Sequence, residues 1–162
     1  KTGDDFEKIL EKTFKEKAKI EDSVFFFKVR NSSKQRGDAN NQFMATRYDY
    51  LRIAKAMLDD WQNDTCVGKY LKTLWENRVD TENDKRRKEG KKVSWVYASG
   101  YAGQFRTHFE GISKKRPVMA MHGRGGQQIV IDFERSRIVA VNSLFLNYNY
   151  EKIVYEPIRK GK

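Results

Sequence analysis

The residues whose types and spacing could do chemistry gather in one stretch, Met121–Gln127 (MHGRGGQ). It joins two apolar runs and therefore predicts a tight glycine turn between two strands, with positive φ at one or two positions. A second interpretation gives the turn a function, in which the glycines let a substrate's backbone approach a strand while His122 presents a hydrogen-bond donor or acceptor. The stretch cannot be a phosphate-binding loop, because it lacks the spaced Gly-Lys-Ser/Thr and does not precede a helix.

The other reactive side chains are weaker candidates. Cys66 has no evident histidine partner, so a structural role is the default. Asp59 and Asp60 are adjacent and therefore point to different faces of a helix, which excludes a catalytic carboxyl pair. His108 lies in an alternating segment, a setting more typical of a surface or hydrogen-bonded histidine than of a catalyst. One cysteine and two histidines exclude a disulfide framework and argue against a structural zinc site, and we expect no metal and no cofactor.

The net charge of +11 over 162 residues favours anionic partners and raises a nucleic-acid-binding module as a hypothesis. Two basic runs motivate it, Lys85–Lys88 and Ser113–Arg116. Acids interleave with the first run at Asp84 and Glu89, and no aromatic residue for base stacking lies inside it. We therefore favour solvated loops over a nucleic-acid surface. No apolar run approaches the roughly 20 residues of a membrane span, and we expect no transmembrane segment.

The elements that must position these residues follow from hydrophobic periodicity. Three segments in the first half predict amphipathic helices: Asp4–Lys19, Thr46–Trp61 and Val67–Arg78. A capping-box pattern of Thr46 with Asp49 starts the second of them. Between the first two, Ser23–Arg30 predicts a strand and Asn31–Asn41 a loop. The charged segment Asp80–Lys92 then predicts a solvated surface stretch.

After Lys92 the periodicity changes to that of strands. The strand-like segments are Val93–Ala98, Tyr101–Phe109, Val118–Met121, Gln128–Asp132 and Arg137–Val141. The last two are joined by four residues and predict a hairpin. The aromatic and apolar residues from Leu144 onward predict a short terminal helix. The order predicts an α+β fold, an antiparallel sheet flanked by helices.

The stretch from His122 to Val141 (HGRGGQQIVIDFERSRIVAV) resembles the C-terminal part of the serine β-lactamase-like family. That family includes class C β-lactamases, D-alanyl-D-alanine carboxypeptidases and many esterases and amide hydrolases. Its members show a glycine-rich motif, Gly-Gly-Gln, an apolar strand, an Asp-Pro-Glu-like turn and a second apolar strand; Phe133 stands here where Pro is frequent. Other segments resemble the family in the same order, so that the resemblance covers nearly the whole chain: Thr2-Gly3, Ile20–Ser23, Ala45–Tyr50 and Tyr101–Phe105.

The resemblance implies a serine hydrolase that cleaves an ester or amide through an acyl-serine intermediate. Its substrate would be a β-lactam, a D-Ala peptide or a small ester. The family needs a Ser-x-x-Lys that supplies the nucleophile and a Tyr-x-Asn whose Tyr moves protons, and this chain contains neither spacing. Residues 1–162 are therefore expected to be the C-terminal part of a single β-lactamase-like domain, with both motifs upstream of Lys1. We expect this chain alone to be inactive.

The resemblance also assigns site residues. Lys1–Gly3 spells the family's third motif, but it precedes an amphipathic helix, whereas that motif must lie on a strand lining the site. The matching positions are His122 and Gly123, with Arg124 and Gly125 as substrate and oxyanion contacts. A neutral His122 clamps a substrate carboxylate less well than Lys at pH 7, a charge that Arg124 could restore.

Two alternatives stay open beside the serine hydrolase. One is the basic nucleic-acid-binding module, the less favoured partner class. The other is a β-lactamase-like relative without catalysis, used as a binding domain. Members of the family are commonly exported, which implies a periplasmic or extracellular location as one expectation for the intact protein.

Overall fold

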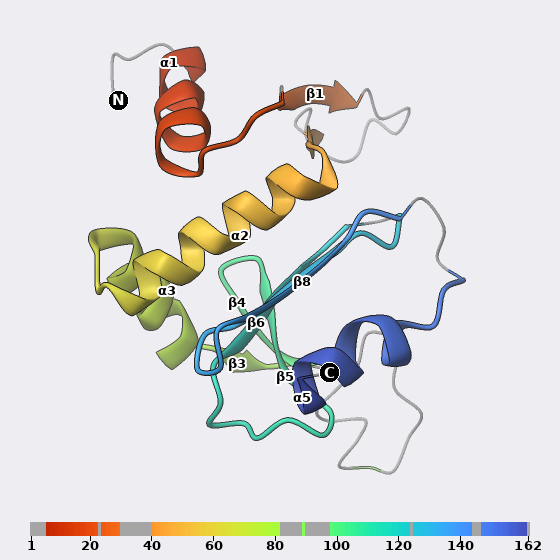
Figure 1. The fold of residues 1–162 in the computed structure, drawn as a ribbon. Coiled ribbons are helices and arrows are strands. Elements are labelled where there is room, and N and C mark those ends of the chain that lie inside the picture. Colours follow the sequence, from red (N-terminus) through yellow and green to blue (C-terminus); the bar gives the residue numbers. More distant parts are fainter. Residues whose placement is uncertain are drawn as a thin grey trace. The chain divides into compact units, whose positions relative to one another are not determined.

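A computed structural model describes residues 6–22, 24–29, 40–81, 89, 98–123, 125–143 and 147–161. The chain divides into two compact units, Lys1–Ile53 and Ala54–Lys162, and each is described by itself. Helices come first, then an antiparallel six-stranded sheet, then helices again (Figure 1). The predicted α+β class is confirmed. None of the helices in the described ranges is long and apolar enough to span a membrane.

The first unit opens with a helix and a two-stranded sheet. Helix α1 (Phe6–Leu10) continues into the π-helical segment η1 (Glu11–Lys17), which agrees with the predicted first helix. Strand β1 (Phe25–Val29) matches its prediction and pairs antiparallel with β2 (Asn40–Met44). The predicted loop was wrong at its end, because Asn40 and Asn41 belong to β2; their sequence lacks strand periodicity, and pairing with β1 holds them extended.

Helix α2 (Arg47–Gln62) begins with the predicted cap. The N–H of Asp49 donates to Thr46 Oγ1 at 3.2 Å, and the Thr46 hydroxyl donates back to Asp49 Oδ2 at 3.0 Å. The buried Asp49 carboxylate also accepts the N–H groups of Glu21 and Asp22, at 3.0 and 3.2 Å. One carboxylate therefore ties the chain that follows η1 to the start of α2.

Helix α3 (Cys66–Glu76) packs closely on the end of α2. Thr65 caps it by accepting the N–H of Gly68, and its hydroxyl donates to Asp60 at 2.6 Å. A Cβ at position 68 would lie 1.9 Å from the carbonyl oxygen of Asp60, so only glycine permits this approach. The apolar spacing predicts Tyr70, Leu71, Leu74 and Trp75 as the buried face. Leu71 and Trp75 are buried, whereas the prediction for Tyr70 was wrong, because its side chain is exposed.

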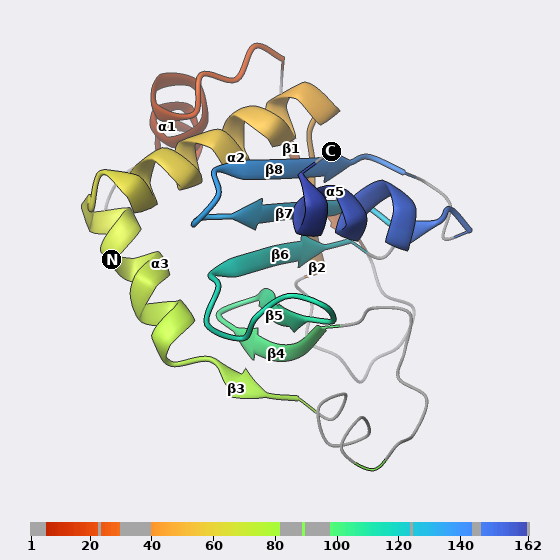
Figure 2. The same ribbon diagram turned by 60° about the horizontal axis from the view of Figure 1, so that its bottom comes forward.

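The second unit is built on a meander in which each strand pairs antiparallel with the next, in the order β3-β4-β5-β6-β7-β8 (Figure 2). The strands are β3 (Val79–Asp80), β4 (Ala98–Ala102), β5 (Phe105–Phe109), β6 (Val118–His122), β7 (Gln128–Asp132) and β8 (Arg137–Val141). The last three confirm their predictions, the β7–β8 hairpin included. Of the predicted strand 93–98, only Ala98 lies within the described residues.

The single strand predicted over Tyr101–Phe109 is wrong. Gly103 and Gln104 have φ of 50° and 75°, and they reverse the chain between β4 and β5. Ala102 pairs with Phe105 across this two-residue turn. Positive φ at both turn residues suits the right-handed twist of the paired strands. A glutamine gives no sequence signal for such a conformation.

The predicted terminal helix is confirmed as η2 (Glu151–Tyr155) followed by α5 (Glu156–Lys160), and both contact β8 (Figure 2). These two segments supply part of the main core, which lies between η2 and α5 on one side and strands β4 to β7 on the other. The fully buried members of that core with less than 2% exposure are Ala98, Val118, Ala120, Val130, Val154, Tyr155 and Ile158.

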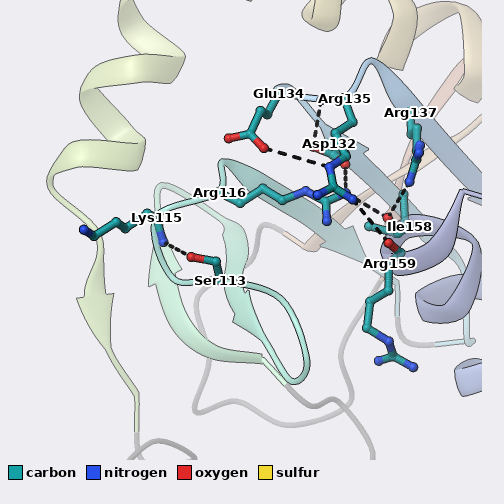
Figure 3. Close-up of polar contacts among 9 residues, drawn as sticks. All are labelled: Ser113, Lys115, Arg116, Asp132, Glu134, Arg135, Arg137, Ile158 and Arg159. Atoms are coloured by element: carbon teal, nitrogen blue, oxygen red, sulfur yellow. Dashed lines mark hydrogen bonds and ion pairs between the residues drawn. The ribbon is translucent and has the colours of Figure 1, made fainter.

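Two arginine side chains from the sheet region donate hydrogen bonds to the C-terminal end of α5 (Figure 3). The buried Arg116 donates to the carboxylate of Asp132 and, at 2.8 Å, to the carbonyl of Ile158. Arg137 donates to the same carbonyl at 3.2 Å, and the N–H of Arg135 donates to the other oxygen of Asp132 at 3.1 Å. The helix C-terminus is thus capped by cations, which its dipole favours.

Candidate active site at the β6–β7 turn

The glycine-rich stretch forms the turn between β6 and β7. His122 and Gln128 are the last paired residues. Beyond them, the N–H of Gly123 donates to the carbonyl of Gln127 at 2.8 Å, and the N–H of Gly126 donates to the carbonyl of Gly123 at 3.2 Å. Gly126 has φ of 91°. This is the hydrogen-bond pattern of a three-residue hairpin loop closed by a glycine bulge. The predicted tight turn with positive φ is confirmed.

The side chain of Gln127 folds back over this turn. Its Oε1 accepts the N–H of Gly125 at 2.9 Å. A Cβ on Gly123 would lie 2.5 Å from that Oε1, and a Cβ on Gly125 would lie 2.6 Å from Gln127 Nε2. The two glycines therefore make room for a carboxamide. The close approach that the sequence suggested for a substrate backbone is made here by the protein's own amide.

His122 ends β6 with a half-buried side chain. Its ring lies 6.4 Å from that of Phe109, centroid to centroid. Burial of the imidazole, and to a smaller extent the positive charge of Arg106, lowers its pKa to about 4. The ring is therefore neutral at pH 7, with one nitrogen as donor and one as acceptor. Both nitrogens are shielded from solvent, and neither has a hydrogen-bond partner among the described residues.

A chain of hydrogen bonds connects the turn to the buried Tyr155. Tyr148 donates its hydroxyl to the carbonyl of Gly126 at 2.7 Å and accepts from Gln128 Nε2 at 3.1 Å. Gln128 in turn accepts the hydroxyl of Tyr155 at 3.3 Å. Burial, followed by the neighbouring Tyr150, raises the pKa of Tyr148 to about 12. Its hydroxyl therefore keeps its proton, and the turn its donor, throughout the physiological pH range.

The structure brings three of the four predicted site residues into this one turn: His122, Gly123 and Gly125. Arg124 lies outside the described residues, as do Lys1–Gly3 and the basic run Lys85–Lys88. Sequence reasoning missed Gln127 and Tyr148 as parts of the site. Gln127 gave a weak signal, because a long polar side chain beside glycines can cover them, whereas Tyr148 gave none.

The other histidine belongs to a polar cluster at the β3–β5 edge. Arg78 donates to His108 Nε2 at 2.5 Å, and His108 Nδ1 lies 3.5 Å from Asp80 Oδ1. Burial first, and then the charges of Arg78 and Lys114, lower the pKa of His108. The hydroxyl of Ser99 donates to the main-chain carbonyl of His108 rather than to its ring. Ser99 is therefore not paired with the imidazole, and the cluster packs the edge of the sheet.

The remaining candidates are dispersed. Cys66 is exposed at the start of α3. Asp59 accepts from Lys55 at 2.7 Å on the surface, while Asp60 accepts from the cap residue Thr65, so the two carboxylates diverge as expected. Over the described ranges, no group of three or more His, Cys, Asp or Glu side chains could hold a metal ion.

Comparison with known proteins finds no matching family model, no matching curated protein and no matching solved structure.

Proposed function

We propose that this chain is the C-terminal part of a serine hydrolase of the β-lactamase-like class. The intact protein would cleave an ester or an amide through an acyl-serine intermediate. The observation that carries the proposal is His122, a neutral imidazole at the end of a strand with two shielded nitrogens that have no partner in the described structure. The resemblance puts the third motif of the family at this position.

A shielded imidazole without hydrogen-bond partners destabilises the fold unless a ligand or another group supplies those hydrogen bonds. Leaving a buried donor or acceptor without a partner costs about 1 to 3 kcal/mol. Native proteins keep few such groups, and each one that persists calls for an explanation, such as strain, a catalytic role, or a bound water or ion. A substrate carbonyl or ether oxygen would satisfy the donor nitrogen of His122. A leaving-group N–H or O–H would satisfy the acceptor nitrogen.

The turn also offers an electrostatic element. In acyl transfer, the serine oxygen bonds to the carbonyl carbon and negative charge develops on the carbonyl oxygen. The Gly125 N–H, fixed by the hairpin, already donates to a carbonyl oxygen at 2.9 Å. A backbone donor held in place this way stabilises the developing charge without reorganisation. We assign it as one oxyanion donor, the other being the N–H of the nucleophile.

The remaining steps belong to residues upstream of Lys1 in this proposal. The Lys of Ser-x-x-Lys and the Tyr of Tyr-x-Asn would take the serine proton and pass it to the leaving group as its bond to carbon breaks. Water would then attack the acyl-serine, the serine would recover its proton, and the acid would leave.

The test is ester hydrolysis by the protein encoded by the whole reading frame that contains this chain. We expect turnover of p-nitrophenyl acetate, and a loss of about 100- to 10,000-fold in kcat/KM for His122→Ala, a range that spans general acid–base and oxyanion contributions. Lys55→Ala, on the exposed face of α2, is the matched control and should keep full activity. An intact frame without turnover would overturn the proposal and favour a non-catalytic relative.

A further inference from the structure

We propose that the Gln127 carboxamide occupies the acyl-oxygen position of the site at rest, and that the carbonyl of a substrate displaces it. The inference rests on the proposed function and adds a residue that determines substrate affinity. Its basis is the contact between Gln127 Oε1 and the N–H of Gly125, 2.9 Å long. A carboxamide presents the same planar carbonyl that an ester or amide substrate would present to that N–H.

The two glycines leave room for this placement. Cβ atoms at positions 123 and 125 would lie 2.5 and 2.6 Å from the carboxamide, so the end of the flexible Gln127 side chain would have to move aside. The surface above the two glycines therefore accommodates a planar amide. A group of that shape and polarity, brought by a substrate, fits the same surface.

The carboxamide can leave without unfolding the turn. The bond to Gly125 is its one hydrogen bond within the described part of the chain, and the side chain is half-buried. The loop is closed independently by two backbone hydrogen bonds, Gly123 to Gln127 and Gly126 to Gly123. Tyr148 holds the carbonyl of Gly126 from the other side. Displacement thus exchanges one hydrogen bond for an equivalent one.

The substrate must displace the hydrogen bond between Gln127 and Gly125, and this displacement weakens substrate binding. A typical hydrogen bond contributes about 0.5 to 1.5 kcal/mol net, equivalent to roughly a 2- to 10-fold change in affinity. Removing the internal competitor should tighten binding by that factor. The bound substrate and the transition state both accept the Gly125 N–H. The tighter binding should therefore lower KM and leave kcat nearly unchanged.

The experiment uses the intact protein and p-nitrophenyl acetate as the probe. We expect Gln127→Ala to lower KM by about 2- to 10-fold with kcat within about 2-fold. We expect Gln127→Glu to raise KM and lower kcat, because a carboxylate binds the N–H more strongly and repels the oxyanion. Gln62→Ala is the matched control, since Gln62 also makes one side-chain hydrogen bond at the surface, to Ser136, away from the turn.

Each result decides between alternatives. A purely structural role for Gln127 predicts that Gln127→Ala lowers the melting temperature and kcat/KM together, and that result would overturn the inference. An unchanged KM in Gln127→Ala, with an active wild type, would also overturn it and leave the proposed function standing. An inactive wild type would overturn the proposed function itself.

Discussion

The hydroxyl of Tyr148 lies 2.7 Å from the carbonyl oxygen of Gly126, although 22 residues separate them in the chain. Through this contact, the segment before η2 braces the turn that carries His122. Tyr148 also accepts from the buried Gln128, so a single hydroxyl joins the turn to the core. The position of the candidate site therefore depends on the C-terminal segment as well as on the two strands that form the hairpin.

Removing the Tyr148 hydroxyl should destabilise the protein. Tyr148→Phe leaves the Gly126 carbonyl and Gln128 Nε2 without this partner, and we expect the free energy of unfolding to fall by about 1 to 3 kcal/mol. Urea denaturation followed by tryptophan fluorescence measures it. Tyr70→Phe is the control, because that side chain on α3 is exposed and should give a change near zero. Equal stabilities for the two variants would refute the bracing role.

Replacing one partner of the buried ion pair between Arg116 and Asp132 should lower the stability of the protein strongly. Asp132→Asn leaves the guanidinium of Arg116 without its charge partner in the interior, and we expect a loss of about 3 to 5 kcal/mol. Calorimetry would report a lower melting temperature. The double variant Arg116→Met, Asp132→Leu should recover a large part of that loss, since no buried charge remains. A single variant as stable as wild type would contradict the assignment.

Asp49 should make the stability of the first unit sensitive to acid. Burial raises the pKa of this carboxyl, but hydrogen bonds from Glu21, Thr46, Asp22 and Arg52 outweigh burial and hold it below 3.8. The folded state then binds its proton less tightly than the unfolded state. The stabilisation is therefore present above pH 3.8 and is lost as the pH falls through the lower folded-state value.

The measurement is hydrogen exchange at the N–H groups of Glu21 and Asp22, which both donate to Asp49, from well above the unfolded-state pKa of 3.8 to well below it. Protection should fall towards the acid end in the wild type. In Asp49→Asn it should be low throughout. Constant wild-type protection across this window would show that the carboxylate does not hold the segment.

His122 should titrate far below an ordinary histidine. Its folded-state pKa of about 4 lies below the unfolded value of 6.5, so the unfolded state binds the proton more readily. Stability is therefore full above pH 6.5 and declines as the pH falls towards 4. An NMR titration of the imidazole Hε1 measures the value directly. A midpoint near 6.5 would mean that the ring is solvated and would remove the observation on which the proposed function rests.

Local patterns predicted most of the elements, and tertiary pairing accounts for the errors. The capping pair Thr46 and Asp49 and the apolar face of α3 lie within a few residues in sequence, so the sequence shows them. The turn at Gly103 and Gln104 was missed because positive φ at a glutamine is imposed by the pairing of Ala102 with Phe105. Strand β2 was missed for the same reason, since β1 holds it extended.

The turn that carries the candidate site was predicted, and the role of its residues stays a prediction. The glycine spacing placed His122, Gly123 and Gly125 at a tight turn between strands, which has a strong local signature. The role of Gln127 depends on how its side chain folds back over the glycines, and that of Tyr148 on a contact across 22 residues. Neither leaves a periodic pattern in the sequence.

The most direct test of the central claim is to look for the acyl-serine nucleophile. The protein from the intact reading frame would be incubated with a fluorophosphonate and analysed by mass spectrometry and peptide mapping, with the 162-residue chain treated in parallel. We predict one adduct, on the serine of a Ser-x-x-Lys upstream of Lys1, and none on the 162-residue chain. An intact protein that takes up no label, or label on a serine within residues 1–162, would contradict the account.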